Sequence, residues 1–308
     1  MCKNYKIPLV ITNGILFCLI LVYISILCYI VKSTIYKLGA DMSFTEDLTL
    51  PSRGIIYRIP DFDGVVHVKP FTTRLYKDLL ASNASESGLR QLIEGCLVNC
   101  PVKAKDMNQE DLLAVLFKTR IMTLGNTLKS KTVCPDCEKS ETIEYDLNDI
   151  EVNYLYTDKY PIPVTLPCGQ EIKIRFQTGA DTRKAEQEAK RRANMFGKKE
   201  DEYLQMYNTV ALLDVGGKDI VEKAEWYEGL NPRDAIYIDS AIAELNGMFG
   251  VKMTREVVCP ECDRRYFTYI SIGSDFFRPD RNIVTGVTSK VGNLAGTSKE
   301  SDSSEQKS

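Results

Sequence analysis

The sequence predicts an α+β fold made of two similar halves, each a β-hairpin followed by helices, with a four-cysteine site joining the halves. Three observations lead to this prediction: short β-branched runs that flank turns, longer runs with apolar residues at helical spacing, and a Cys-Pro-x-Cys motif near the end of each half. The chain has 308 residues, of which 44% are apolar and 26% are charged. That composition is ordinary for a globular protein, and the length allows two cores.

The first half begins with a predicted hairpin. Its expected strands are 55–60 and 65–71, and Asp61-Phe62-Asp63-Gly64 is the expected turn, because Asp-Gly between β-branched runs is typical of hairpins. Three helices should follow, each with apolar residues at helical spacing, over residues 72–82, 87–98 and 108–124.

The second half repeats this plan. Strands are expected at 162–166 and 171–176, around the turn Pro167-Cys168-Gly169-Gln170. Asn231-Pro232 should begin a helix, because asparagine favours the cap position and proline the first turn. The predicted helices cover residues 181–196, 202–213 and 234–248.

Three motifs recur in the same order near the ends of the two halves. They pair as follows: Asn108-Gln109-Glu110-Asp111 with Asn231-Pro232-Arg233-Asp234, Leu124-Gly125 with Phe249-Gly250, and Val133-Cys134-Pro135-Asp136-Cys137 with Val258-Cys259-Pro260-Glu261-Cys262. A strand-like run follows each cysteine motif, at 142–147 and 266–272. This shared order is typical of an internal duplication.

The chain therefore divides into four parts. A hydrophobic leader covers 1–41, the first hairpin and helical unit covers 42–150, and the second covers 151–284. The tail at 285–308 has few large apolar residues, so we expect it to be disordered.

The two Cys-Pro-x-Cys motifs are the strongest candidate for a functional site, formed by Cys134, Cys137, Cys259 and Cys262. Two residues between paired cysteines let both thiolates point at one ion, and two such pairs complete a tetrahedral sulfur site with Zn–S distances of about 2.3 Å. Four thiolates leave no open ligand position, so one Zn²⁺ per chain would be structural and would join the two halves. An iron–sulfur or redox site and unmetallated thiols are the alternatives. Redox pairs usually lie at a helix N-terminus, whereas each of these pairs lies between predicted strands.

Charge and residue content exclude several classes of function. Lys plus Arg is 39 and Asp plus Glu is 42, and the resulting net charge of −3 argues against nucleic acid as a partner. The polar helix at 181–196 has pairs such as Glu188–Arg192 at i,i+4, which indicate a solvated, ion-paired helix.

The single histidine, His67, lies in a predicted strand. We expect no catalytic residues, no enzymatic activity and no cofactor besides the metal, and we assign no role to the remaining cysteines Cys2, Cys18, Cys28, Cys96, Cys100 and Cys168.

Residues 9–31 contain no charge, and as a helix they would span about 35 Å, enough to cross a membrane. Residues 1–41 hold four basic residues and one acidic residue, whereas 42–308 hold 35 basic and 41 acidic residues, a net charge of −6. The second part also opens with its own methionine, Met42. Two interpretations stay open: the leader is a membrane anchor, or translation starts at Met42 and the leader lies upstream of it.

Several motifs resemble a known family. They are LPSRGIIY at 50–57, the hairpin ending in Lys69-Pro70-Phe71, RIMTLG at 120–125, and the two cysteine motifs. In this order, over about residues 50–272, they resemble the baseplate hub subunit family of T-even-type contractile-tailed phages. The resemblance implies a non-enzymatic hub component, or an assembly factor for the hub and tape-measure proteins. Members of that family begin near the first motif and lack a membrane anchor, which favours a start at Met42.

The sequence thus favours a baseplate hub subunit or hub assembly factor that binds other phage tail proteins, in the host cytoplasm during assembly and in the baseplate of the virion. The alternative is a single-pass membrane adaptor with a zinc-ribbon domain, anchored by residues 9–31. A thiol oxidoreductase that uses the Cys-Pro-x-Cys motifs is a third class.

Overall fold

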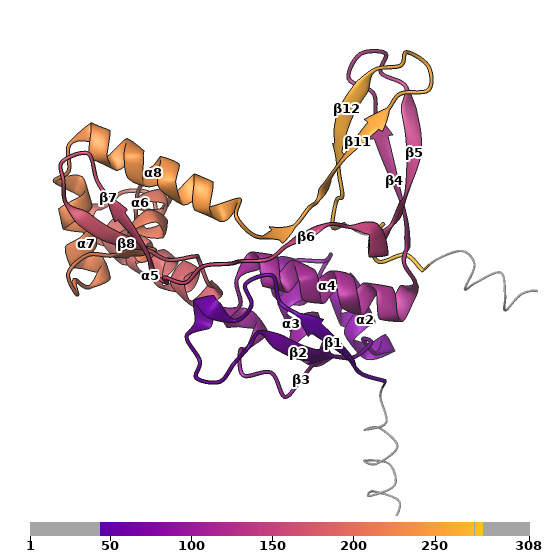
Figure 1. Cartoon of the computed structure of the whole chain (residues 1–308), viewed down its shortest axis with the longest axis horizontal. Coiled ribbons are helices and arrows are strands. Elements are labelled where there is room, and N and C mark those ends of the chain that lie inside the picture. Colours follow the sequence, from indigo (N-terminus) through magenta and orange to yellow (C-terminus); the bar gives the residue numbers. More distant parts are fainter. Residues whose placement is uncertain (1–43, 274, 280–308) are drawn as a thin grey trace, which may run out of the picture. The chain divides into compact units, whose positions relative to one another are not determined.

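The computed structural model describes residues 44–273 and 275–279 of the chain (Figure 1). The hydrophobic segment at 9–31 and the tail at 285–308 lie outside these residues, so the expectations for them stay predictions. Within the described ranges, no helix is long and apolar enough to cross a membrane. Helices and short antiparallel strands alternate along the chain, which confirms the predicted mixture of α and β structure.

The first half contains a small antiparallel sheet and three α-helices. Its elements in chain order are β1 (Glu46–Thr49), η1 (Ile55–Tyr57), β2 (Val65–Val68), α2 (Thr73–Ala81), α3 (Glu86–Cys96), β3 (Leu97–Val98), η2 (Ala104–Asp106) and α4 (Gln109–Leu124). The strand order is β1-β2-β3, so β2 is central. The three predicted helices are confirmed, and each follows a residue whose side chain accepts an N–H of the first turn, namely Thr72, Ser85 and Asn108.

The predicted first strand at 55–60 is wrong. The strand that pairs with β2 is β1, and residues 55–57 form the single turn η1 instead. Gly54 and Arg58 flank this turn with φ of 72° and 54°. Because these left-handed residues cannot continue a β-strand, the β-branched run turns and buries Ile56.

The helix α4 is buried on nearly every side, although its sequence predicts one apolar face. It shares a core with the sheet, and the chain beyond the last strand covers it elsewhere: the rings of Phe117 and Phe276 lie 5.1 Å apart. Arg120 is 1% exposed and donates to the carbonyl oxygens of Phe276 at 3.1 Å and Thr127 at 2.8 Å. The core of the first half is therefore completed by residues from the end of the described chain.

The second half has the same order of strands and helices up to its third strand, and then has one more α-helix than the first half. Its elements are β7 (Ile162–Thr165), β8 (Glu171–Ile174), α5 (Gly179–Phe196), α6 (Asp201–Ala211), β9 (Leu213–Asp214), α7 (Ile220–Glu228) and α8 (Pro232–Asn246). In both sheets, two helices connect the second strand to the third, and the order β7-β8-β9 matches β1-β2-β3. The predicted β7/β8 hairpin and the three predicted helices are confirmed, with Asn231 capping α8. The sequence did not predict α7.

The helix α5 is less solvated than its polar sequence suggests. Three alanines at i, i+4 and i+8 form a buried stripe: Ala185, Ala189 and Ala193. The predicted pair Glu188–Arg192 is replaced by two others, Glu188 with Arg191 at 2.6 Å and Arg192 with Glu228 of α7 at 2.8 Å. The small alanine side chains let α6 pack closely on this face, and the charges lie on the other sides.

Two longer hairpins, which we call the first and second ribbon, follow α4 and α8. The first ribbon is β4 (Thr127–Val133) with β5 (Ser140–Asp146), and the second is β11 (Thr254–Val258) with β12 (Arg265–Tyr269). Between them the chain forms η3 (Leu147–Asp149), β6 (Val152–Asn153) and, after α8, β10 (Gly250–Val251). Because β6 pairs with β10, the chain that enters the second half runs beside the chain that leaves it (Figure 1).

Two buried aspartates hold corresponding turns in the two halves. Asp111 and Asp234 are each the third residue of their helix, α4 and α8, and are 0% and 1% exposed. Asp111 accepts hydrogen bonds from the backbone N–H of Ser52 at 2.9 Å and from its hydroxyl at 2.6 Å. Asp234 accepts the backbone N–H of Cys168 at 3.1 Å. Since Ser52 and Cys168 each follow a Leu-Pro pair, the same kind of turn is tied to the same helix position twice.

Asp111 also positions η1. The Tyr57 hydroxyl donates to Asp111 at 2.6 Å and accepts the backbone N–H of Asn108 at 3.0 Å. Burial raises the pKa of the Asp111 carboxyl and raises the pKa of Tyr57 well above its ordinary value. This network explains why the run at 55–57 folds toward α4.

The substitution Asp111→Ala should lower the free energy of unfolding by about 3 kcal/mol, because it leaves buried donors of Ser52 and Tyr57 without an acceptor. Urea denaturation measures the change. Asp158→Ala is the control, because Asp158 is exposed and its loss should cost less than about 0.5 kcal/mol. Equal losses in the two variants would contradict the role assigned to Asp111.

Candidate metal centre

The two ribbons bring the four predicted cysteines together. Cys134 and Cys259 directly follow β4 and β11, and Cys137 and Cys262 lie in the turns that lead to β5 and β12. All four Sγ atoms lie within 4.8 Å of one another. Each turn contributes one buried cysteine, Cys134 or Cys259, and one exposed cysteine.

The distances between the sulfur atoms fit a single four-coordinate ion. Cys134 Sγ lies 3.7 Å from Cys262 Sγ, and Cys137 Sγ lies 3.6 Å from Cys259 Sγ. Four thiolates at about 2.3 Å from a tetrahedral ion stand about 3.8 Å apart. A disulfide would need about 2.0 Å, so these are free thiols in ligand-like positions.

The two cysteine turns have the same backbone geometry. In each, the first cysteine donates its N–H to the carbonyl five residues later, at 3.0 Å in the first ribbon and 2.9 Å in the second. Its own carbonyl accepts the N–H of the residue four positions later, at 3.0 Å in both. Those residues, Glu138 and Asp263, have φ of 57° and 55°. The turns are therefore two copies of one conformation.

Ion pairs across the cluster repeat this correspondence. Lys139 of the first turn pairs with Glu261 of the second, and Arg264 of the second pairs with Asp136 of the first at 3.5 Å. The residues are exposed, so solvent screens both pairs and neither adds much to stability. The pairs help to orient the two turns relative to each other, because the basic residue of each turn contacts the acidic residue of the other.

The strand registers of the two ribbons are also equivalent. Val133 lies opposite Ser140, and Lys129 lies opposite Glu144 in the first ribbon. Adding 125 to each number gives the second ribbon's pairs, Val258 opposite Arg265 and Thr254 opposite Tyr269. A position in one ribbon can therefore be compared directly with its counterpart in the other.

The inner faces of the ribbons pack against each other next to the cysteines. The Tyr145 hydroxyl donates to Thr268 Oγ1 at 3.3 Å, and the Tyr266 hydroxyl donates to Glu141 Oε1 at 2.6 Å. The hydrogen bond to Glu141 raises the pKa of Tyr266 to about 12. Tyr266 and Val257 share a small apolar cluster with Cys134 and Cys259, which shields one side of the sulfur site.

The chemistry of the cluster suits ligation of a thiophilic ion. The backbone N–H of Cys137, hydrogen-bonded to the sulfur of Cys134, lowers the pKa of the Cys134 thiol to about 7. The pKa of the Cys262 thiol is instead raised to about 12, so this ligand would release its proton when an ion binds. Each pair lies between strands, as predicted, and not at a helix N-terminus where redox pairs usually lie.

The other cysteines and the histidine lie elsewhere. Cys96 belongs to the core of the first half, where burial raises its pKa to about 12. Cys100 is partly buried, and Cys168 is exposed in the turn between β7 and β8. His67 lies in β2, as predicted, with Nδ1 at 2.6 Å from Asp47 Oδ1 on the exposed side of the strand. The remaining three, Cys2, Cys18 and Cys28, fall outside the described residues.

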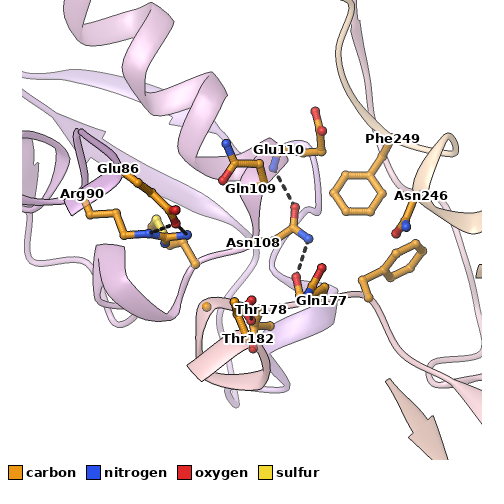
Figure 2. A pocket seen from close by; sticks show the side chains of 13 residues that line it. Glu86, Arg90, Asn108, Gln109, Glu110, Gln177, Thr178, Thr182, Asn246 and Phe249 are labelled. Carbon is orange, nitrogen blue, oxygen red and sulfur yellow. Dashed lines mark hydrogen bonds and ion pairs between the residues drawn. The ribbon is translucent and has the colours of Figure 1, made fainter. Parts of the chain in front are cut away.

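A cavity of about 400 Å³ lies where α3 and the start of α4 meet the residues before α5 (Figure 2). Asn108, which caps α4, reaches across it. Its Nδ2 donates to the carbonyl of Gln177 at 2.6 Å, and its Oδ1 accepts the N–H of Glu110 at 2.8 Å. The sequence predicted Asn108 only as a helix start, because no local pattern reveals a contact with a residue 69 positions away.

Several polar groups that line this cavity are engaged with the protein itself. Arg90 pairs with Glu86 at 2.9 Å and donates to the carbonyl of Ala104 at 2.9 Å. Glu110 accepts the N–H of Val251 at 3.1 Å, and burial raises its pKa. No cysteine, serine or histidine is among the described residues that line it. The cavity is thus a polar seam between the halves.

Comparison with known proteins identifies a family. Residues 49–278 match a protein family described as T4 bacteriophage base plate protein. The matched range includes β2 and β3, the sheet of β7, β8 and β9, both ribbons and all four clustered cysteines, and it begins at the last residue of β1. No curated protein and no solved structure matches the chain.

The substitution Tyr266→Phe should destabilise the packing of the ribbons by about 1 kcal/mol, because it removes the hydrogen bond to Glu141. Tyr269→Phe is a matched control: Tyr269 lies in the same strand, but it is 62% exposed on the opposite face. Urea denaturation of both variants checks the difference. A control that loses as much stability as Tyr266→Phe would refute the assignment.

Proposed function

The chain belongs to the T4 bacteriophage base plate protein family, and from this premise we propose that it is a non-enzymatic hub subunit or hub assembly factor that binds other tail proteins. Membership in the family points to the baseplate of the virion and implies contact with other tail proteins. The observation that carries the proposal is the extent of the match, which takes in both halves and the ribbons that join them. The motif order at 50–57 and 120–125 supports the finer assignment to the hub.

The four clustered cysteines bind one structural Zn²⁺ in this proposal. Support comes from the donor set, which is four sulfurs with no other ligand type, and from spacings of 3.6 and 3.7 Å between sulfurs of different ribbons. An all-sulfur tetrahedral site favours zinc and leaves no position for substrate. Since each ribbon supplies two ligands, the ion would stabilise the folded chain by linking its two halves.

The two halves are units of 42–150 and 151–284 that arose by duplication of one ancestral unit. The matching strand orders, the paired aspartates Asp111 and Asp234, and the constant offset of 125 between the ribbons support this proposal. A platform made in this way presents related but different surfaces from each half. That property suits a protein whose role is to hold several partners together.

Elemental analysis of the purified full chain should find one zinc per chain. Cys134→Ser combined with Cys259→Ser should abolish it, whereas Cys168→Ser should retain it, because Cys168 lies apart from the cluster. Chelation should lower the free energy of unfolding by about 4 kcal/mol or more, the effect of a ligand present at a thousand times its Kd. Absence of metal from the parent chain, or full retention in the double variant, would overturn the site.

Disruption of the gene in the phage that carries it should yield particles without complete baseplates, and the full chain supplied in trans should restore them. Electron microscopy of the tails measures the defect. The Cys134→Ser/Cys259→Ser chain should fail to restore assembly, and the Cys168→Ser chain should succeed. Complete baseplates in the absence of the gene would disprove the proposed function.

A further inference from the structure

The outer faces of the two ribbons carry different side chains at equivalent positions, although the backbones of the ribbons have the same geometry. On the second ribbon, Phe267 and Tyr269 point outward and are 75% and 62% exposed. The equivalent residues of the first ribbon, 125 positions earlier, are Thr142 and Glu144. One polar pair and one aromatic pair thus occupy the same two positions of the same ladder.

The first ribbon shows that the fold needs no ring at these positions. There Glu144 forms a solvated cross-strand ion pair with Lys129 at 2.8 Å. On the second ribbon the cross-strand neighbours of Phe267 and Tyr269 are Glu256 and Thr254. Among the described residues, neither ring stacks on another aromatic ring or on a cation. The two rings are large apolar groups without a partner of their own, a feature typical of protein interfaces.

The backbone of the same two residues is also free to pair. One backbone hydrogen bond lies just beyond each end of the second ribbon. The N–H of Cys259 donates to the carbonyl of Arg264 at 2.9 Å, and the N–H of Ile270 donates to the carbonyl of Met253 at 2.8 Å. Bonded and non-bonded pairs alternate in an antiparallel ladder, so the N–H and C=O groups of Phe267 and Tyr269 point away from β11. Among the described residues, no third strand pairs with β12.

We propose that β12 binds an extended segment of another baseplate protein, which adds to its free edge as a strand and covers Phe267 and Tyr269 with apolar side chains. Strand addition supplies the main-chain hydrogen bonds, and the two rings select the partner. Because the rings are two residues apart on one face, the partner carries apolar side chains at every second position. This inference rests on the proposed function, since it takes the partner to be a tail protein.

The size of the surface favours a segment over a second folded copy of this chain. Five residues of β12 span about 17 Å, and the outer face of a two-stranded ribbon is about 10 Å wide, an area on the order of 200 Å². A stable interface between folded proteins buries about 800 Å² on each partner. An area on the order of 200 Å² is enough for a single added strand, because its backbone hydrogen bonds to β12 contribute to binding in addition to the apolar contact.

The test exchanges the aromatic residues for those of the first ribbon. Phage that carry Phe267→Thr/Tyr269→Glu should give a yield of complete baseplates reduced by about tenfold or more. Thr142→Ala/Glu144→Ala is the matched control on the other ribbon and should leave the yield unchanged. The zinc content and urea midpoint of both purified chains show whether each variant folds.

Hydrogen exchange tests the strand itself. The amides of Phe267 and Tyr269 should exchange rapidly in the free chain and slowly in purified baseplates. A photo-crosslinker at position 267 should capture a peptide of another tail protein with alternating apolar residues. Capture of a second copy of this chain, or unprotected amides in assembled baseplates, would overturn the proposal.

The outcomes separate this inference from the function on which it rests. If disruption of the gene leaves baseplates complete, the proposed function fails. If disruption blocks assembly but Phe267→Thr/Tyr269→Glu assembles normally, the function stands and the inference about β12 is wrong.

Discussion

The meeting of the two cysteine turns is the contact on which the rest of the structure depends. It joins Cys137 and Cys259, whose sulfurs lie 3.6 Å apart although the residues are 122 positions apart in the chain. To reach this point, the chain must leave the first half, build a complete second half and return beside its own path, which the pairing of β6 with β10 shows. Closing so long a loop is entropically costly, so it needs strong contacts at the point of closure. The packed ribbons and their four thiols supply them.

Local sequence patterns predicted the elements that local contacts determine. The hairpin of β7 and β8, the cap at Asn108 and the strands on both sides of each cysteine pair follow from turn residues and periodicity, and the structure confirms them. The run at 55–60 misled because β-branched residues favour strands, whereas its conformation is set by Asp111, more than fifty positions away. The burial of α4 on nearly every side had the same cause, since Phe276 covers it from the far end of the described chain.

Comparison of the halves distinguishes the residues that the shared backbone requires from those that differ between the two copies. Asp111 and Asp234 are both buried carboxylates at the third position of a helix, and each holds a turn after Leu-Pro. The charges at the cysteine turns also keep their signs from one half to the other. The two copies differ sharply on an exposed face at Glu144 and Tyr269, so the shared backbone does not require either residue. A role in binding, and not in folding, is the simplest explanation of the difference.

The same closure couples the sulfur site to the core of the first half. Phe276 and Phe277, which follow β12 in the sequence, are both 0% exposed in that core. If the second ribbon detached together with the residues that follow it, Arg120 would lose its hydrogen bonds to the carbonyl oxygens of Phe276 and Arg278. Removal of acceptors from a buried cation is unfavourable, so release of the ribbon is coupled to opening of the core. The sulfur site therefore stabilises more than the residues around it, because a local opening there would have to disrupt the largest hydrophobic core of the described chain.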